Sequence, residues 1–261
     1  MSNKDKPKFR CSGIGHLMTE PKLKADKDAG NLSEGAKTHV VDVWTNWKYK
    51  RREELYSKYI EKGNELEEDA ITLVSVQTGI FHKKNENNLS NEWISGTPDL
   101  FIGPDIENAE FIEDTKCSWD VFTFNRTKQK KLNDLYYWQM QGYMMLTGAK
   151  EARLRYCLLN ATDDLIRDEI RKLGYAMRLI DFEETPEFME RAAMVERNMI
   201  YDLAGFRKRY PNFDLHLNVS EWQYDIPASE RLYTVVVKRD ESDIELIKAK
   251  VEKAWRFMEN L

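Results

Sequence analysis

Two short runs of aromatic and β-branched residues, each with an acidic side chain inside it, constrain the fold of this 261-residue chain more than any other feature. The first run covers residues 93–103 and contains Asp99, and the second covers residues 109–118 and contains Asp114. A Gly-Pro-Asp sequence at residues 103–105 separates them and is typical of a turn. Together the two runs predict the strands of a β-hairpin.

The acids of this predicted hairpin are spaced to share one site. Fourteen residues separate Asp99 from the sequence Asp114-Thr115-Lys116. Side chains two apart on a strand point to the same face, so Asp114 and Lys116 share a face and the hairpin brings Asp99 beside them. Carboxylates are ligands of Mg²⁺, which bridges them to a substrate phosphate, and a nearby lysine stabilises transition-state charge. The pattern is therefore typical of phosphodiester hydrolysis.

An ordinary surface hairpin explains the same pattern, with a simple ion pair between Asp114 and Lys116. The D-x-K pattern alone is too common to favour catalysis. A third acid changes the balance, because Glu67 shares the apolar face of the preceding predicted helix, whereas Glu65 and Glu68 lie on its polar face. A carboxylate that faces a core must be paired or bind a metal, so we expect Glu67 to be the third ligand.

Apolar residues at helical spacing predict several helices around the hairpin. Gly79 and Gly148 are typical helix ends, and Thr185-Pro186 is a typical helix start. The predicted helices cover residues 53–77, 131–147 and 185–207, and a closing amphipathic helix carries Ile244, Ile247, Val251, Trp255 and Met258 on one face.

The rest of the pattern predicts strands and loops. Residues 153–159 and 232–238 are expected to be strands. Residues 10–18 are expected to form a Ser- and Gly-rich turn, and the lysine-rich residues 20–31 a surface loop.

The composition excludes several classes of protein. Forty Lys+Arg against 45 Asp+Glu give a net charge of −5, which excludes a wholly basic nucleic-acid wrapper but allows a local basic groove. With 41% hydrophobic residues the chain can form a real core, and we expect one domain over residues 1–261. No long apolar run, no secretory signal and only three dispersed cysteines predict a soluble cytoplasmic protein without membrane, disulfide, zinc or iron–sulfur chemistry.

Four motifs in a fixed order carry a resemblance to a known family. They are Gly63-Asn-Glu-Leu-Glu-Glu-Asp-Ala, Gly96-Thr-Pro-Asp, Glu113-Asp-Thr-Lys-Cys and Trp138-Gln-Met-Gln-Gly-Tyr-Met. With them the chain resembles the phage lambda exonuclease and YqaJ-type viral recombinase nucleases of the PD-(D/E)XK superfamily, over residues 8–160 and again near 231–258. The resemblance implies a restriction-endonuclease-like α/β core, with a central mixed sheet flanked by helices. Residues 163–227 match no part of the family and are read as an insertion in a single nuclease domain.

The resemblance also implies an activity. It implies a Mg²⁺-dependent exonuclease, with Mn²⁺ as a substitute, that acts on double-stranded DNA ends in a phage or prophage recombination system. Such enzymes degrade one strand in the 5′-to-3′ direction, release 5′-mononucleotides and leave a 3′ single strand for an annealing recombinase. They are typically ring-shaped homo-oligomers, and a trimer is the expected form.

Roles for individual residues follow from the same match. Glu67, Asp99, Asp114 and the Thr115 carbonyl would be metal ligands, and Lys116 would be the catalytic lysine. Gln139 stands at the position of the family's helix glutamine, and a small shift of register would give that role to Gln141 instead. Asp114 departs from the lambda-type motif, which commonly has Glu there, although both acids fit the superfamily pattern.

Three further segments are expected to contact DNA. Arg10 and Ser12 resemble the family's segment that recognises the terminal 5′-phosphate, and an N-cap by Ser12 is the structural alternative. Two basic clusters predict salt-dependent contacts to the DNA backbone, although solvated surface charge is the simpler explanation of the clusters taken alone. These clusters are Lys48, Lys50, Arg51 and Arg52, and then Arg126, Lys128, Lys130 and Lys131.

Two other functions stay open at the level of sequence. One is a PD-(D/E)XK endonuclease, which would cut closed circular DNA. The other is a non-catalytic module that binds DNA ends with acids of purely structural use, and the complete set of acids and lysine argues against it.

Overall fold

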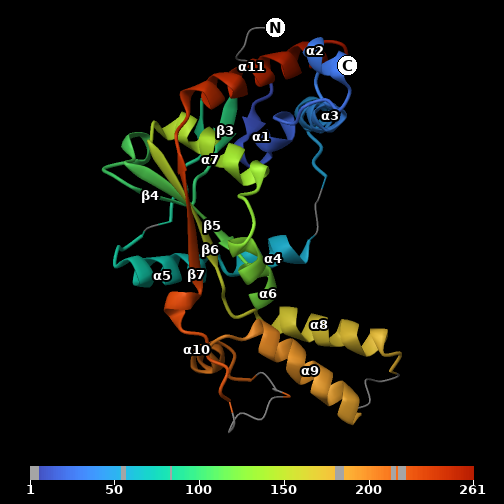
Figure 1. Cartoon of the computed structure of the whole chain (residues 1–261), viewed down its shortest axis with the longest axis vertical. Helices are drawn as coiled ribbons and strands as arrows, with labels where there is room; N and C mark the ends of the chain where they lie inside the picture. The colour runs from blue at the N-terminus through green and yellow to red at the C-terminus, as the bar shows by residue number, and fades with distance from the viewer. Residues whose placement is uncertain (1–5, 54–56, 83, 180–184, 213–215, 217–221) are drawn as a thin grey trace.

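A four-stranded mixed sheet forms the centre of the molecule in the computed structural model, which describes residues 6–53, 57–82, 84–179, 185–212, 216 and 222–261 (Figure 1). The strand order is β4-β5-β6-β7, with β5 and β6 parallel and the other neighbours antiparallel. The strands are β4 (Leu100–Ile102), β5 (Phe111–Cys117), β6 (Glu151–Cys157) and β7 (Leu232–Lys238). This mixed sheet confirms the predicted α/β fold class and the predicted strands near residues 153–159 and 232–238.

The predicted hairpin is confirmed only for residues 100–102 at the end of the first run, which form β4. Strand β4 pairs antiparallel with β5, and Leu100 lies opposite Glu113. The start of the first run instead forms β3 (Ile94–Gly96) in a separate small sheet with β1 (Phe9–Arg10) and β2 (Leu89–Ser90). The run divides at Pro98, which has no N–H to donate to a strand ladder. The Asp99 carboxyl group therefore lies where the chain passes from one sheet to the other.

Helices cover both faces of the central sheet. Helix α5 (Glu67–Thr78) packs on one face, and α7 (Asp134–Thr147) packs on the other and places Gln139 against β5. The other helices near α7 are α1 (Cys11–Leu17), α3 (Glu34–Tyr49) and the closing helix α11 (Glu241–Met258) (Figure 1). The five apolar residues predicted for one face of α11 are all buried, which confirms that prediction.

The predicted helix over residues 53–77 is wrong in one respect, because it consists of two helices. Helix α4 (Lys58–Glu65) ends where Leu66 leaves the helical conformation, with φ −105° and ψ 10°, and α5 begins directly after it. The buried Leu66 side chain packs in the apolar cluster beneath the sheet, so tertiary packing overrides the local helical pattern. Glu67 consequently lies in the first turn of α5, where a carboxylate stabilises the helix dipole. Residues 54–56 of the prediction lie outside the described part of the chain.

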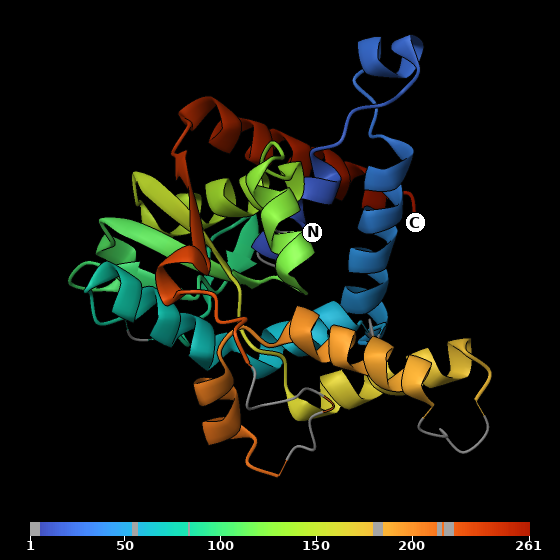
Figure 2. The same ribbon diagram turned by 60° about the horizontal axis from the view of Figure 1, so that its bottom comes forward.

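The predicted helix over residues 185–207 is also two helices, α9 (Pro186–Met199) and α10 (Leu203–Arg209). Thr185 caps α9 as predicted, but the chain is extended at Ile200 and Asp202 caps α10 through the Gly205 N–H. Helix α9 lies beside α8 (Asp163–Ala176) in the lower part of the molecule (Figure 2). These helices share a separate apolar cluster that includes Ile166, Met199 and Phe206. The single domain with an insertion at residues 163–227 stays a prediction.

The predicted turn at residues 10–18 is wrong, because these residues form the end of β1 and helix α1. Strand β1 pairs with β3, and Gly15 lets α1 lie directly on α7, since a Cβ there would be 2.7 Å from Leu135 Cα. The exposed loop at residues 20–31 contains the short helix α2 (Lys24–Asp28). Helices α3 and α6 (Val121–Lys128), strand β2 and the short 3₁₀ turns Ile106–Asn108 and Ala228–Glu230 were not predicted.

Candidate active site

The site lies at the junction of β4 and β5, where Asp99 contacts the second acidic motif. The Thr115 backbone N–H donates to Asp99 Oδ2 at 2.7 Å, and the Thr115 hydroxyl donates to the same oxygen at 3.0 Å. These two bonds hold the Asp99 carboxylate beside β5. The hairpin geometry inferred from the two acidic runs is therefore present at this point.

Asp114 is nearly fully buried, with 1% of its surface exposed, and is held from two sides. Lys116 Nζ forms an ion pair with Asp114 Oδ2, as expected for residues that share one face of β5. Gln139 Nε2 lies 3.2 Å from Asp114 Oδ1 and 2.9 Å from the Tyr143 hydroxyl. The structure thus brings Asp99, Asp114, Lys116 and Gln139 together.

The two candidate glutamines point in different directions, and Gln139 is the one that contacts Asp114. Gln141 donates to the Tyr137 hydroxyl and to the Lys238 carbonyl, and it accepts from the Asp240 N–H. It therefore joins α7 to the end of β7, whereas Gln139 contacts the site.

The charges of the site are strongly coupled. Burial, together with the neighbouring Asp114, raises the pKa of Asp99 to about 7 against the opposing effects of Lys116 and of the Thr115 hydrogen bonds. Burial disfavours the Lys116 ammonium, but Asp114 and Asp99 more than offset this and raise the Lys116 pKa. The Lys116 ammonium also lies 5.1 Å from the centre of the Tyr136 ring. Lys116 is consequently a positive group at neutral pH, held against two acids.

Glu67, the expected third ligand, is turned toward a different partner. Lys84 Nζ lies 2.9 Å from Glu67 Oε2 and 3.4 Å from Glu68 Oε1. Glu67 is half-buried, whereas Glu65 and Glu68 are exposed, as their positions on the helix predicted. Within the described residues, no three acidic, histidine or cysteine side chains gather closely enough to form a complete ligand set.

Asp99 and Asp114 nonetheless fit a divalent cation. Their carboxylates are close enough for one to raise the pKa of the other, and a cation relieves that repulsion. Glu67 lies in the first turn of α5. It would complete the set of metal ligands once its ion pair with Lys84 is broken. The residues present therefore match the oxygen-rich chemistry of Mg²⁺ and Mn²⁺.

A buried ionic network lies directly behind the site and was missed from the sequence. Glu113, which is fully buried, lies 2.8 Å from His82 Nε2 and accepts from Arg155 Nε at 3.0 Å, and Arg155 also donates to the Thr234 hydroxyl at 2.7 Å. The network joins the segment after α5 to β5, β6 and β7. The period of two along β5 turns Glu113 away from Asp114 and was the one sequence signal for a separate role of Glu113. The partners of Glu113, His82 and Arg155, are far from it in the chain, so the sequence pattern did not identify them.

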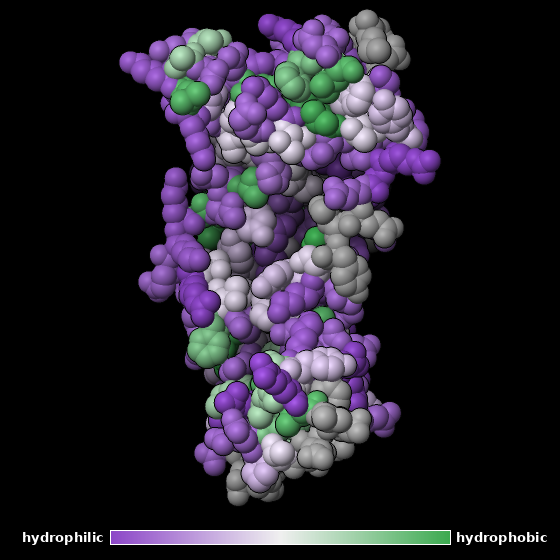
Figure 3. Space-filling model, turned by 90° about the vertical axis from the view of Figure 1, so that its right-hand side faces the viewer, coloured by the Kyte–Doolittle hydropathy of each residue, from purple (hydrophilic) through white to green (hydrophobic). Residues whose placement is uncertain are grey.

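The predicted DNA-contacting residues lie on the surface. Arg10 and Ser12 are exposed at the start of α1, and the alternative of a Ser12 N-cap is wrong because Arg10 occupies that position. All eight basic residues of the two clusters are exposed except Lys128, which is half-buried with its ammonium 4.1 Å from the centre of the Phe124 ring. The side of the molecule that includes α3 and α4 is largely hydrophilic and recessed at mid-height (Figure 3). In the described residues no helix is long and apolar enough to cross a membrane.

A mixed sheet with Asp99 directly before β4, and with Asp114 and Lys116 on the adjacent β5, defines a nuclease of the PD-(D/E)XK type. A phage-related exonuclease from Haemophilus somnus 129PT has a similar structure, with 30% sequence identity, a TM-score of 0.68, and coverage of 100% of this chain and 97% of that chain. The chain belongs to this family of phage exonucleases of the lambda exonuclease and YqaJ type.

Two more distant structures share the fold. The alkaline exonuclease LHK-Exo from Laribacter hongkongensis is 15% identical, with a TM-score of 0.57 and coverage of 97% of this chain and 88% of that chain. The same enzyme in complex with dAMP is 15% identical, with a TM-score of 0.56 and coverage of 99% and 91%. No protein-family model and no curated protein matches the sequence.

Proposed function

We propose that this nuclease is a Mg²⁺-dependent exonuclease that degrades double-stranded DNA from its 5′ end. It releases 5′-mononucleotides and leaves a 3′ single strand, in a phage or prophage recombination system. The observation that carries the proposal is the convergence of Asp99, Asp114, Lys116 and Gln139 in a chain of the phage exonuclease family.

The residues of the site have distinct roles in this proposal. Asp99, Asp114, the Thr115 carbonyl and Glu67 would hold the cation, Mg²⁺ or Mn²⁺, which polarises the phosphoryl oxygen and lowers the pKa of a bound water. Gln139 orients the buried Asp114 carboxylate through its hydrogen bond. Lys116 supplies positive charge where the phosphodiester gains negative charge in the transition state.

The DNA end would be bound by residues outside the reacting centre. Arg10 and Ser12 would contact the terminal 5′-phosphate, because a guanidinium reads a phosphate with two parallel hydrogen bonds. The basic clusters at residues 48–52 and 126–131 would follow the DNA backbone. Family membership supports a ring-shaped homo-oligomer, with a trimer favoured, that works in the host-cell cytoplasm and passes the single strand to an annealing recombinase.

One digestion experiment tests the proposal. A linear duplex labelled at one 5′ end and a covalently closed circle are incubated with the protein in Mg²⁺, in Mn²⁺ and in EDTA. Release of labelled 5′-mononucleotide from the linear DNA alone, and only with metal, is the expected result. Nicking of the circle would show an endonuclease instead, and binding without hydrolysis in either metal would show a non-catalytic module.

A further inference from the structure

The segment that follows α5 contacts all three acid-bearing elements of the candidate site. His82 Nε2 lies 2.8 Å from Glu113 Oε2, beside Asp114 in the chain, and Lys84 pairs with Glu67. The Asn85 N–H donates to the backbone carbonyl of Asp99 at 2.8 Å. Lys84 therefore lies between two anchored residues, and its place next to the site is set by the fold.

The side chain of Asn85 strengthens this anchor. Its Nδ2 donates to the Pro98 carbonyl at 2.8 Å, and the residue is 5% exposed. His82 is 4% exposed, and its backbone N–H donates to the Ser75 hydroxyl on α5 at 3.2 Å. His82 and Asn85 are thus fastened to the core, while the Lys84 side chain is 35% exposed and held, among the described residues, only by its surface ion pairs with Glu67 and Glu68.

The Lys84 ammonium is paired with a Glu67 oxygen that the proposed metal site would use. Lys84 Nζ is 2.9 Å from Glu67 Oε2, so the Glu67 carboxylate is already neutralised by a cation of the chain. An ammonium and a divalent cation that approach the same carboxylate compete for its charge and its lone pairs. The described residues include no complete three-acid ligand set, which agrees with a Glu67 held outside the site.

We propose that Lys84 holds Glu67 away from the metal site and competes with the divalent cation for its carboxylate. Lys84 is thus a positioning residue that sets how much Mg²⁺ the site needs, through its ion pair with Glu67. The inference rests on the proposed function, because it assumes that Glu67 is a metal ligand. Both partners are about one-third exposed, so the ion pair is weak enough for a cation to displace it.

Calorimetric titration of the full-length, metal-free protein with Mn²⁺ and then Mg²⁺, without DNA, tests this inference. Lys84→Met is expected to bind the metal about two- to fivefold more tightly than the unmodified protein, as loss of an exposed ion pair allows. Lys84→Arg retains a cation next to Glu67 and is expected to stay within about twofold of the unmodified protein. In a Glu67→Gln background the Lys84→Met change is expected to have no further effect on metal affinity.

Lys58 supplies a matched control. It is also 35% exposed and lies 3.2 Å from a glutamate, Glu169, on another helix. Lys58→Met removes the same charge and is expected to leave metal affinity unchanged, which separates the local ion pair from a general change in net charge.

The outcomes separate the two proposals. Unchanged or weaker metal binding in Lys84→Met, while Asp99→Asn abolishes binding, would overturn the role of Lys84 and leave the metal site intact. Absence of Mn²⁺ and Mg²⁺ binding in the unmodified protein and in every variant would overturn both.

Discussion

At the scale of single residues, the site depends on the period of two along β5. Asp114 and Lys116 point to one face, toward α7, while Glu113 points to the other, toward the buried network. Two adjacent acids of the same strand therefore have different chemistry. Asp114 joins a group of coupled charges with Asp99, and Glu113 is paired with Arg155.

Lys116→Ala is expected to lower the rate of DNA hydrolysis by about 10²- to 10³-fold, because the only ammonium described next to Asp114 is removed. Single-turnover digestion of labelled linear duplex measures the rate, and DNA binding in Ca²⁺ is expected to persist. Lys248→Ala, a control on α11 that removes a half-buried lysine paired with the exposed Glu245, is expected to retain full activity. Full activity of Lys116→Ala would remove the lysine from the mechanism.

The raised pKa of Asp99 predicts a pH-dependent effect on stability. The folded protein retains a proton on this carboxyl group up to about pH 7, whereas the unfolded chain loses it near pH 4, so Asp99 lowers the free energy of unfolding as the pH rises between those values. Asp99→Asn cannot ionise and keeps an acceptor oxygen for Thr115. In EDTA it is expected to be more stable than the unmodified protein by about 1–2 kcal/mol at pH 8 and by less at pH 5.

Urea unfolding at the two pH values measures this difference. A stability gain that is the same at pH 5 and pH 8 would show that ionisation of Asp99 is not its cause.

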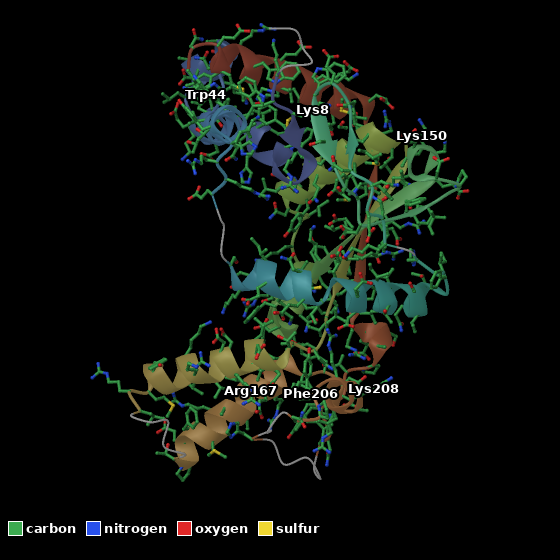
Figure 4. The ribbon with its side chains drawn as sticks, turned by 180° about the vertical axis from the view of Figure 1, so that it is seen from behind. Lys8, Trp44, Lys150, Arg167, Phe206 and Lys208 are labelled. Carbon is green, nitrogen blue, oxygen red and sulfur yellow. The ribbon has the colours of Figure 1, made fainter. Side chains whose placement is uncertain are left out.

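At the scale of secondary-structure elements, the site is assembled by contacts that join a few strands and helices. Helix α7 brings Gln139 to β5, and the Leu66 carbonyl, directly before Glu67 and α5, lies 3.9 Å from Cys117 Sγ at the end of the same strand. Helices α4 and α5 lie end to end across the sheet in the view from behind (Figure 4). The buried network of Glu113, His82 and Arg155 fastens the end of α5 to three strands.

Arg155→Met is expected to destabilise the protein by about 3–5 kcal/mol, because it leaves Glu113 buried with its principal partner removed. Arg191→Met is the matched control, since Arg191 pairs with Glu187 on the surface of α9 and its loss is expected to cost less than about 1 kcal/mol. Chemical unfolding of both variants measures the effect. Similar values for the two would contradict a structural role for the buried network.

At the scale of the whole molecule, a chain with net charge −5 must bind a polyanion through local basic surfaces. The two exposed basic clusters belong to the end of α3 and to α6 and the residues that follow it. Phosphate contacts release counterions, so the affinity for DNA is expected to fall steeply with salt.

Replacement of Lys48 and Arg51 by Ala is expected to reduce the slope of log affinity against log salt by about 2, because each lost phosphate contact reduces it by about 1. Fluorescence anisotropy of a labelled duplex in Ca²⁺ measures the slope. Arg171→Ala and Arg256→Ala, which remove basic residues paired on α8 and α11, are the controls and are expected to leave the slope unchanged. A slope unaffected by loss of Lys48 and Arg51 would place the DNA elsewhere.

The sequence by itself determined the features that depend on local geometry. The period of two along β5 placed Asp114 and Lys116 on one face, glycines at 79 and 148 ended helices in the left-handed conformation, and apolar spacing identified the buried face of α11. These features need only neighbouring residues, because backbone geometry and burial preferences act over a few positions.

Only the tertiary structure decided which distant residues meet. It divided the first acidic run at Pro98, separated α4 from α5 at Leu66, and directed Gln139 rather than Gln141 to Asp114. It also paired Lys84 with Glu67. Each of these results depends on the packing of surfaces that lie far apart in the chain, and local preferences of a fraction of a kcal/mol yield to burial terms several times larger.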